Sequence, residues 1–115
     1  MRRTFIETKL FTKQWFNIGL GDEALRLLQN QIMDNPKIGN VIPGTGRLRK
    51  MRFAIGNSGK RGCSRVCYVD FSEFGVVYLM TVYAKNEKEN LTQRECADIK
   101  KYIDLIEKGL KEKYS

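Results

Sequence analysis

The sequence contains no histidine among its 115 residues. Histidine is the commonest general base in enzymes and the commonest metal ligand. Its absence excludes the most familiar routes to acid–base catalysis and to zinc binding. The three cysteines, Cys63, Cys67 and Cys96, are too few for a structural zinc site, which takes four such ligands. We therefore expect no metal, no cofactor, and reduced thiols.

Long apolar runs are also absent. No stretch approaches the ~18 residues of a transmembrane helix, and the first residues, MRRTFIETKLF, lack the apolar segment of a secretory signal. The sequence therefore predicts a cytoplasmic protein with no membrane partner. A hydrophobic content of 42%, with one Trp, six Phe and five Tyr, is enough to build the core of a single domain over residues 1–115.

Acidic residues are missing from the middle of the chain, between Asp34 and Asp70. We call residues 35–69 the basic window. Its eight cations are Lys37, Arg47, Arg49, Lys50, Arg52, Lys60, Arg61 and Arg65. The net charge of the whole chain is +8, so the remainder of the chain is neutral in sum. Positive charge concentrated in this way indicates a surface that binds a polyanion, and nucleic acid is the first candidate.

Hydrophobic periodicity predicts seven elements in the order β-α-α-β-β-β-α. Strands are expected at 3–8, 48–55, 64–71 and 76–85, and helices at 10–18, 22–35 and from Thr92 onward. Thr92 and Glu95 form a T-x-x-E capping box at the start of the last helix. The order predicts an α+β fold, with a small antiparallel sheet, helices packed on one of its faces, and a basic concave surface on the other.

Alternation along the two central strands is expected to gather cations on one face. Met51 and Phe53 point to one side of the first of these strands, and Lys50 and Arg52 to the other. In the next strand Arg65 lies on the side opposite to the apolar positions. The free face of the sheet is therefore where Lys50, Arg52 and Arg65 are expected to project.

The turn between these strands, GNSGKRG at 56–62, shares glycines and a lysine with phosphate-binding P-loops. That motif requires GxxxxGK followed by Ser or Thr. Here Ala54 occupies the position of the first glycine, and Arg61 follows Lys60. We exclude nucleotide binding by this route.

Four segments together resemble the RelE/ParE superfamily of bacterial toxins, and most closely its HigB branch. They are FIET (5–8), NPKIGNVIPGTGRLRKMR (35–52), GKRGCSRVCY (59–68) and VYLMTVYAKNEKENLT (77–92). The spacing and the order of elements agree over essentially the whole chain. Arg47 departs from the pattern, in which a second glycine follows GTG.

This resemblance implies the toxin of a type II toxin–antitoxin pair with a RelE-like fold. HigB- and RelE-like toxins cut mRNA in the ribosomal 30S A site, a cognate HigA-like antitoxin neutralises them, and the toxin–antitoxin complex binds operator DNA. ParE-like members inhibit DNA gyrase without nuclease activity, and this function is the alternative. A repressor acting alone is disfavoured, because the cations lie on strands and not on a recognition helix.

The residues of the basic window suit metal-free RNA cleavage by the 2′-hydroxyl, which requires alignment, charge stabilisation and two proton transfers. Arginine stays protonated, so it can clamp a phosphate but cannot act as a base. A lysine can act as a base in its neutral form, which neighbouring cations favour. Tyrosine can stack on a base or relay a proton.

We predict Arg65 as the clamp for the transition state and either Lys50 or Lys85 as the base or acid. The predicted catalytic residues are Lys50, Arg65, Tyr83 and Lys85, and the predicted RNA- or phosphate-binding residues are Arg49, Arg52, Lys60 and Arg61.

Overall fold

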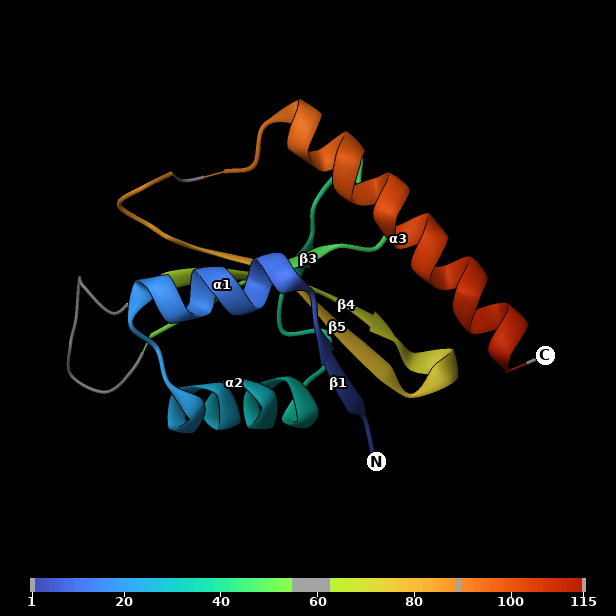
Figure 1. The fold of residues 1–115 in the computed structure, drawn as a ribbon, viewed down its shortest axis with the longest axis horizontal. Helices are drawn as coiled ribbons and strands as arrows, with labels where there is room; N and C mark the ends of the chain where they lie inside the picture. Colours follow the sequence, from blue (N-terminus) through green and yellow to red (C-terminus); the bar gives the residue numbers. More distant parts are fainter. Residues whose placement is uncertain (1, 55–62, 89, 115) are drawn as a thin grey trace.

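A computed structural model describes residues 2–54, 63–88 and 90–114 (Figure 1). Its elements are β1 (Thr4–Glu7), α1 (Lys9–Ile18), α2 (Asp22–Asp34), β2 (Asn40–Val41), β3 (Arg49–Phe53), β4 (Ser64–Phe71), the short 3₁₀ helix η2 (Ser72–Phe74), β5 (Val76–Ala84) and α3 (Gln93–Lys113). The α+β class and the order of the predicted elements are confirmed. The two-residue strand β2 lies in a segment that the sequence predicts as a loop.

The five strands form one sheet in the order β1-β5-β4-β3-β2. Strands β3, β4 and β5 pair in antiparallel fashion, as predicted. The unpredicted β2 also pairs antiparallel with β3, but β1 runs parallel to β5. The prediction of a wholly antiparallel sheet is therefore wrong at β1. This strand lies at the start of the chain and reaches β5 without a tight turn, so no hairpin forces the two strands to run in opposite directions.

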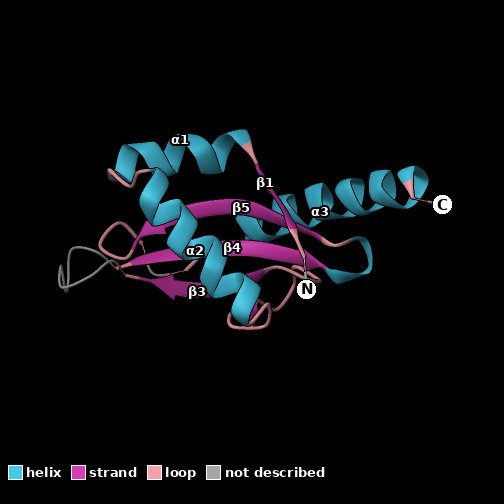
Figure 2. Cartoon of the chain, turned by 90° about the horizontal axis from the view of Figure 1, so that it is seen from below, coloured by secondary structure: helices cyan, strands magenta, loops and turns pink. Residues whose placement is uncertain are grey.

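Helices α1 and α2 cover one face of the sheet. Phe11 and Trp15 of α1, together with Leu28 and Ile32 of α2, are buried against the apolar side chains of that face. The rings of Phe11 and Trp15 stack with centroids 5.4 Å apart. In Figure 2, α2 lies in front of the strands and α3 lies behind them.

Helix α3 covers part of the opposite face, so the prediction that all helices pack on one face is wrong. Ile103 and Leu110 of α3 are buried against a second apolar cluster that includes Val69 and Phe71 of β4. The physical reason is that β4 and β5 are apolar on both faces, and both faces then require cover. None of the helices within the described residues is long and apolar enough to cross a membrane.

Helix α3 begins where the sequence predicts. The Thr92 hydroxyl accepts a hydrogen bond from the Glu95 backbone N–H at 3.0 Å, and the Glu95 carboxylate accepts one from the Thr92 N–H at 2.9 Å. The predicted capping box is therefore present. It fixes the point at which the segment after β5 becomes helical, close to the end of the sheet that carries the cations.

Strand β5 contains a bulge that changes the direction of its later side chains. Tyr68 of β4 pairs with Leu79, whereas the preceding Cys67 pairs with Thr81, so Met80 has no partner of its own. A bulge of one residue shifts the alternation of all side chains that follow it. As a result Val82 joins the cluster under α1 and α2, and Tyr83 joins the cluster on the α3 side.

Candidate functional site

Cations from two neighbouring strands lie side by side at one end of the sheet. Arg52 on β3 is directly opposite Arg65 on β4, and Arg65 is in turn opposite Tyr83 on β5. Lys50 precedes Arg52 by two residues and projects from the same face of β3. Like charges that face each other across a sheet lower its stability. Folding alone therefore does not favour this arrangement.

Lys50, Arg52 and Arg65 line one pocket of about 520 Å³, which we call the cationic pocket. Its other lining residues are Ile38, Asn40 and Met51. Arg52 is exposed, whereas Arg65 is only 9% exposed. Within residues 2–54, 63–88 and 90–114, none of the three cations forms an ion pair. The pocket therefore presents positive charge that the described part of the protein leaves unneutralised.

The wall of the cationic pocket is held in place by the buried Tyr68 of β4. Its hydroxyl donates a hydrogen bond to the Pro36 carbonyl at 2.8 Å and accepts one from the Gly39 N–H at 3.1 Å. Gly39 packs directly on β3, where an added Cβ would lie 2.8 Å from the Lys50 carbonyl oxygen. The segment that supplies Ile38 and Asn40 is thus fixed against the backbone of Lys50.

Tyr83 is placed beside Arg65 but is largely covered. Its side chain is 4% exposed, and the Lys88 ammonium lies over its ring, 5.3 Å from the centroid. Burial, and to a smaller extent the nearby Cys67 thiol, together raise the pKa of the Tyr83 hydroxyl to about 12, against the opposing effect of Arg65. Tyr83 therefore stays protonated at neutral pH, which suits a hydrogen-bond donor or acid better than a base.

The two lysines predicted as base or acid are placed differently. Lys50 lines the cationic pocket, and its ammonium donates to the Asn90 side-chain oxygen at 2.8 Å. Lys85 is exposed in the turn after β5, and its backbone N–H donates to the Cys63 carbonyl at 3.3 Å. Lys85 thus lies near the start of β4 but does not line the cationic pocket.

Two further cations of the basic window lie elsewhere. Arg49 has the opposite orientation to Lys50 on β3, and its guanidinium donates to the Gly39 carbonyl at 2.7 Å. Arg47 forms ion pairs with Glu73 at 2.9 Å and with Glu107 at 3.3 Å. Neither residue lines the cationic pocket. The predicted phosphate-binding residues Lys60 and Arg61 lie outside the described residues.

The sequence did not indicate three side chains that contact the site. The Cys63 sulfur accepts a hydrogen bond from the Arg65 guanidinium at 3.2 Å. Asn90 holds Lys50, and Lys88 covers Tyr83 while pairing with Glu95 at 2.7 Å. Asn90 and Lys88 belong to the segment between β5 and α3, whose path the sequence pattern does not predict.

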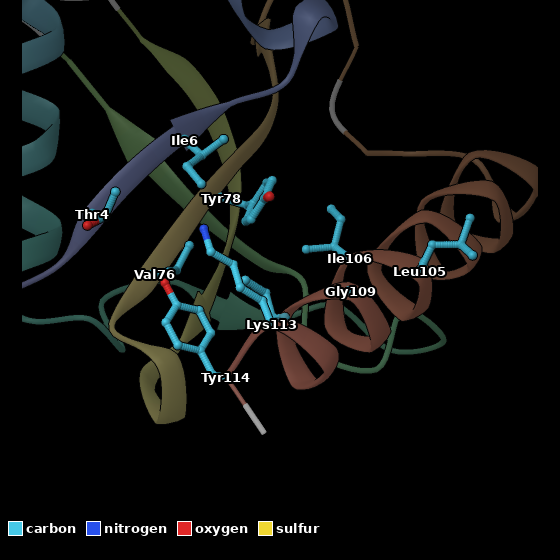
Figure 3. Close-up of a pocket in the computed structure, with 10 residues that line it drawn as sticks. Thr4, Ile6, Val76, Tyr78, Leu105, Ile106, Gly109, Lys113 and Tyr114 are labelled. Carbon is cyan, nitrogen blue, oxygen red and sulfur yellow. The ribbon is translucent and has the colours of Figure 1, made fainter.

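A second pocket, of about 350 Å³, lies between β1, β5 and the C-terminal half of α3 (Figure 3). Ile6, Val76, Tyr78 and Ile106 form its apolar part, and Lys113 is the one charged residue among those that line it. None of the described residues that line it also lines the cationic pocket. Its other polar side chains are the hydroxyls of Thr4, Tyr78 and Tyr114, so it does not gather cations as the cationic pocket does.

The arrangement of elements is similar to that of two solved structures. A mutant of the E. coli toxin RelE in its free state matches 77% of this chain and 90% of its own, with a TM-score of 0.53 and 20% sequence identity. The chain has a RelE-like fold. The intact E. coli RelBE toxin–antitoxin complex matches 70% of this chain and 93% of its own, with a TM-score of 0.50 and 21% identity. No protein-family model matches the sequence.

Proposed function

We propose that this protein is the toxin of a toxin–antitoxin pair and that it cleaves mRNA on the ribosome, as HigB- and RelE-like toxins do. The observation that carries the proposal is the cationic pocket, in which Lys50, Arg52 and Arg65 from adjacent strands converge without a carboxylate partner among the described residues. The RelE-like fold supports the same conclusion, since the proteins that share it include a toxin and a toxin–antitoxin complex.

The pocket suits cleavage by the 2′-hydroxyl of the RNA itself. The 2′-oxygen attacks the adjacent phosphorus, and the bond from phosphorus to the 5′-oxygen of the next nucleotide breaks. A 2′,3′-cyclic phosphate and a 5′-hydroxyl result, with one proton lost from the 2′-oxygen and one gained by the 5′-oxygen. In this proposal Arg65 and Arg52, which both line the cationic pocket, bind the non-bridging oxygens, where negative charge accumulates in the transition state.

The proton transfers fall to the remaining polar groups. Lys50 in its neutral form accepts the proton of the 2′-hydroxyl, with Lys85 as the other candidate. Tyr83 is protonated at neutral pH and lies opposite Arg65, so it can donate a hydrogen bond to the phosphate or to the leaving oxygen. This set of proton-transfer groups is poor, and we infer that the ribosome contributes to catalysis.

The proposal also assigns partners. A HigA-like antitoxin would bind and neutralise the toxin, and the complex of the two would bind operator DNA. The RelBE complex supports an antitoxin partner, because that complex joins a toxin of the same fold to an antitoxin.

The test is to express the wild type and Arg65→Ala in a bacterium and to map mRNA 5′ ends, with translation running and with initiation blocked. We expect cuts in register with codons that disappear in the mutant and when initiation is blocked. Arg26→Ala, which removes an exposed arginine on α2, is the matched control and should cut like the wild type.

Each other outcome has a definite meaning. Cuts that persist when initiation is blocked would make the protein a ribonuclease that acts without the ribosome. Growth arrest and DNA breaks with intact mRNA would replace the proposal with gyrase inhibition. Retained cutting by a well-expressed Arg65→Ala would remove Arg65 from the mechanism.

A further inference from the structure

A third hollow lies beside the cationic pocket, between α1 and the segment that follows β5. Its volume is about 1070 Å³. The residues that line it are Gln14, Asn17, Ile18, Cys63, Val82, Tyr83, Ala84, Asn86, Glu87 and Lys88. Three of these side chains are amides, so we call it the amide pocket. Cys63 joins it to the cationic pocket, since its sulfur accepts a hydrogen bond from Arg65 at 3.2 Å.

Gln14 is held in one orientation at this pocket. Its side-chain oxygen accepts hydrogen bonds from the Thr81 hydroxyl at 2.7 Å and from the Val82 backbone N–H at 3.1 Å. A backbone N–H can only donate, so the oxygen end of the amide must face β5. Strand β1 ends its pairing at Leu79, and Gln14 therefore takes the place of a neighbouring strand beside Val82.

The amide nitrogen of Gln14 is the end that remains for a ligand. The described residues offer it no acceptor among the hydrogen bonds of Gln14, and no buried side-chain nitrogen or oxygen in this part of the chain lacks a partner. The nitrogen is therefore accessible from the pocket or the solvent. A donor in a fixed direction distinguishes ligands by where they carry an acceptor.

The charge of the amide pocket suits a neutral group and not a phosphate. Among the described residues that line it, the charged ones are Glu87 and Lys88, which have opposite signs. Lys88 is also paired with Glu95 at 2.7 Å. The cations without a carboxylate partner among the described residues, Arg52 and Arg65, line the neighbouring cationic pocket. A strand of RNA carries both kinds of group, with each charged phosphate linked to a neutral base that presents donors and acceptors.

We propose that the amide pocket holds the nucleobase next to the phosphate bound in the cationic pocket, and that Gln14 selects this base. The inference rests on the proposed RNA cleavage. The Gln14 N–H group donates to a carbonyl oxygen, which guanine carries at O6 and uracil at O4. Adenine and cytosine carry amino donors at the corresponding positions, which would face the donor of Gln14. The pocket therefore favours guanine or uracil.

Gln14→Glu is the sharpest variant. The carboxylate keeps an oxygen acceptor for Thr81 and Val82, so the anchor to β5 survives, while the group that faces the pocket changes from donor to acceptor. Gln31→Glu is the matched control, because it makes the same charge change at an exposed position of α2. Thermal melting of all three proteins checks that the fold is retained.

The cut sites of the three proteins are mapped in cells under active translation. We expect the wild type and Gln31→Glu to favour guanine or uracil at one position beside the cut, by roughly 2- to 12-fold, the range of one hydrogen bond. Gln14→Glu should lose this preference and favour adenine or cytosine there. An unchanged base preference in a Gln14→Glu protein that still cuts would overturn the proposal.

A second measurement keeps this inference separate from the proposed cleavage. In ¹⁵N spectra of the wild type, the Gln14 side-chain signals are assigned by their loss in Gln14→Glu, and GMP, UMP, AMP and CMP are titrated in turn. We expect larger shifts with GMP and UMP than with AMP and CMP. If no translation-dependent cuts occur, the proposed function fails, and this titration alone decides whether the pocket binds a base. Equal or absent shifts with all four nucleotides would overturn it.

Discussion

Two groups of arginines from the same basic window have opposite surroundings. Arg47 pairs with Glu73 and Glu107, donates to the Asp70 carbonyl at 2.9 Å, and lies 4.7 Å from the centroid of the Phe71 ring. Arg52 and Arg65 face each other across two strands without an ion pair in the described ranges. All three side chains are guanidinium cations, but among the described residues only Arg47 has carboxylate partners.

The difference shows what a count of charges cannot show. Arg47 joins the end of β4 to α3 through Glu107, so its charge stabilises the fold. The cations of the cationic pocket repel one another, and their arrangement gains stability only when an anion binds. A basic window of eight cations therefore contains at least two kinds of arginine, and their partners, not their number, separate structure from function.

The largest expected effect comes from mutating arginines on the two faces of β3, which tests whether arginines without a carboxylate partner bind RNA. Arg52→Ala should weaken binding of single-stranded RNA by roughly 10- to 100-fold, because it removes a charged hydrogen-bond donor from the phosphate. The slope of log K against log salt should fall by about 0.7 for each phosphate that the variant no longer neutralises. Fluorescence anisotropy with a labelled RNA over a series of salt concentrations measures both.

Arg49→Ala is the matched variant on the other face of the same strand. Its guanidinium is already bound to the Gly39 carbonyl, so we expect a smaller loss of affinity and an unchanged salt slope. The sequence predicts that Arg49 also binds RNA phosphate. An equal decrease of the slope in both variants would support that prediction and contradict the division of β3 into two faces.

Arg47→Ala tests the neutralised group. We expect the free energy of unfolding to fall by roughly 1–2 kcal/mol, from the loss of two partly exposed ion pairs and a cation–π interaction. Urea denaturation gives this value, and Lys100→Ala, which removes an exposed pair with Asp104, is the control with a smaller loss. RNA affinity should stay at the wild-type value. A loss of affinity in folded Arg47→Ala would show that this group also contacts RNA.

The smallest expected effect is the pH dependence of the stability that the Arg47–Glu73 ion pair contributes. The hydrogen bond from Arg47 holds the pKa of Glu73 below its usual range. A lowered folded-state pKa contributes stability above the unfolded value of about 4.3, and this contribution is lost as the pH falls through the lower folded value. Glu73→Gln should therefore be less stable than the wild type at pH 7, by under about 1 kcal/mol, and the difference should shrink at pH 3. An equal difference at both values would exclude the charge as its cause.

The sequence predicts most of the fold because local patterns determine most of its elements. The strand predicted at 64–71 matches β4, and the other strand and helix boundaries differ by only a few residues. Met51 and Phe53 are buried while Arg52 is exposed, as alternation predicts, because one face of β3 lies against α1 and α2. Convergence of Lys50, Arg52 and Arg65 follows from the same alternation.

The parts that the sequence did not predict depend on contacts between distant segments. The direction of β1 and the face covered by α3 are set by packing, since both strands and helices offer apolar sides that fit more than one partner. In the sequence Gln14 is an ordinary polar residue of an amphipathic helix. Its hydrogen bond to Val82 becomes evident only once α1 is placed beside the part of β5 that β1 does not pair with. The bonds of Asn90 and Lys88 likewise depend on how the segment before α3 folds back.

The bulge at Met80 shifts the alternation of β5 by one residue, so every later side chain of the strand points to the opposite face of the sheet. Counted in twos from Val76, an unbroken β5 would place Val82 on the α3 side and would bury Tyr83 under α1 and α2. The one extra residue exchanges these two destinations, so Tyr83 and Arg65 share a face only in the shifted frame. Deleting Met80 would keep every residue of the site in the sequence, but it would turn Tyr83 to the face of the sheet opposite to Arg65. The site therefore depends on the number of residues in β5 as well as on their identity.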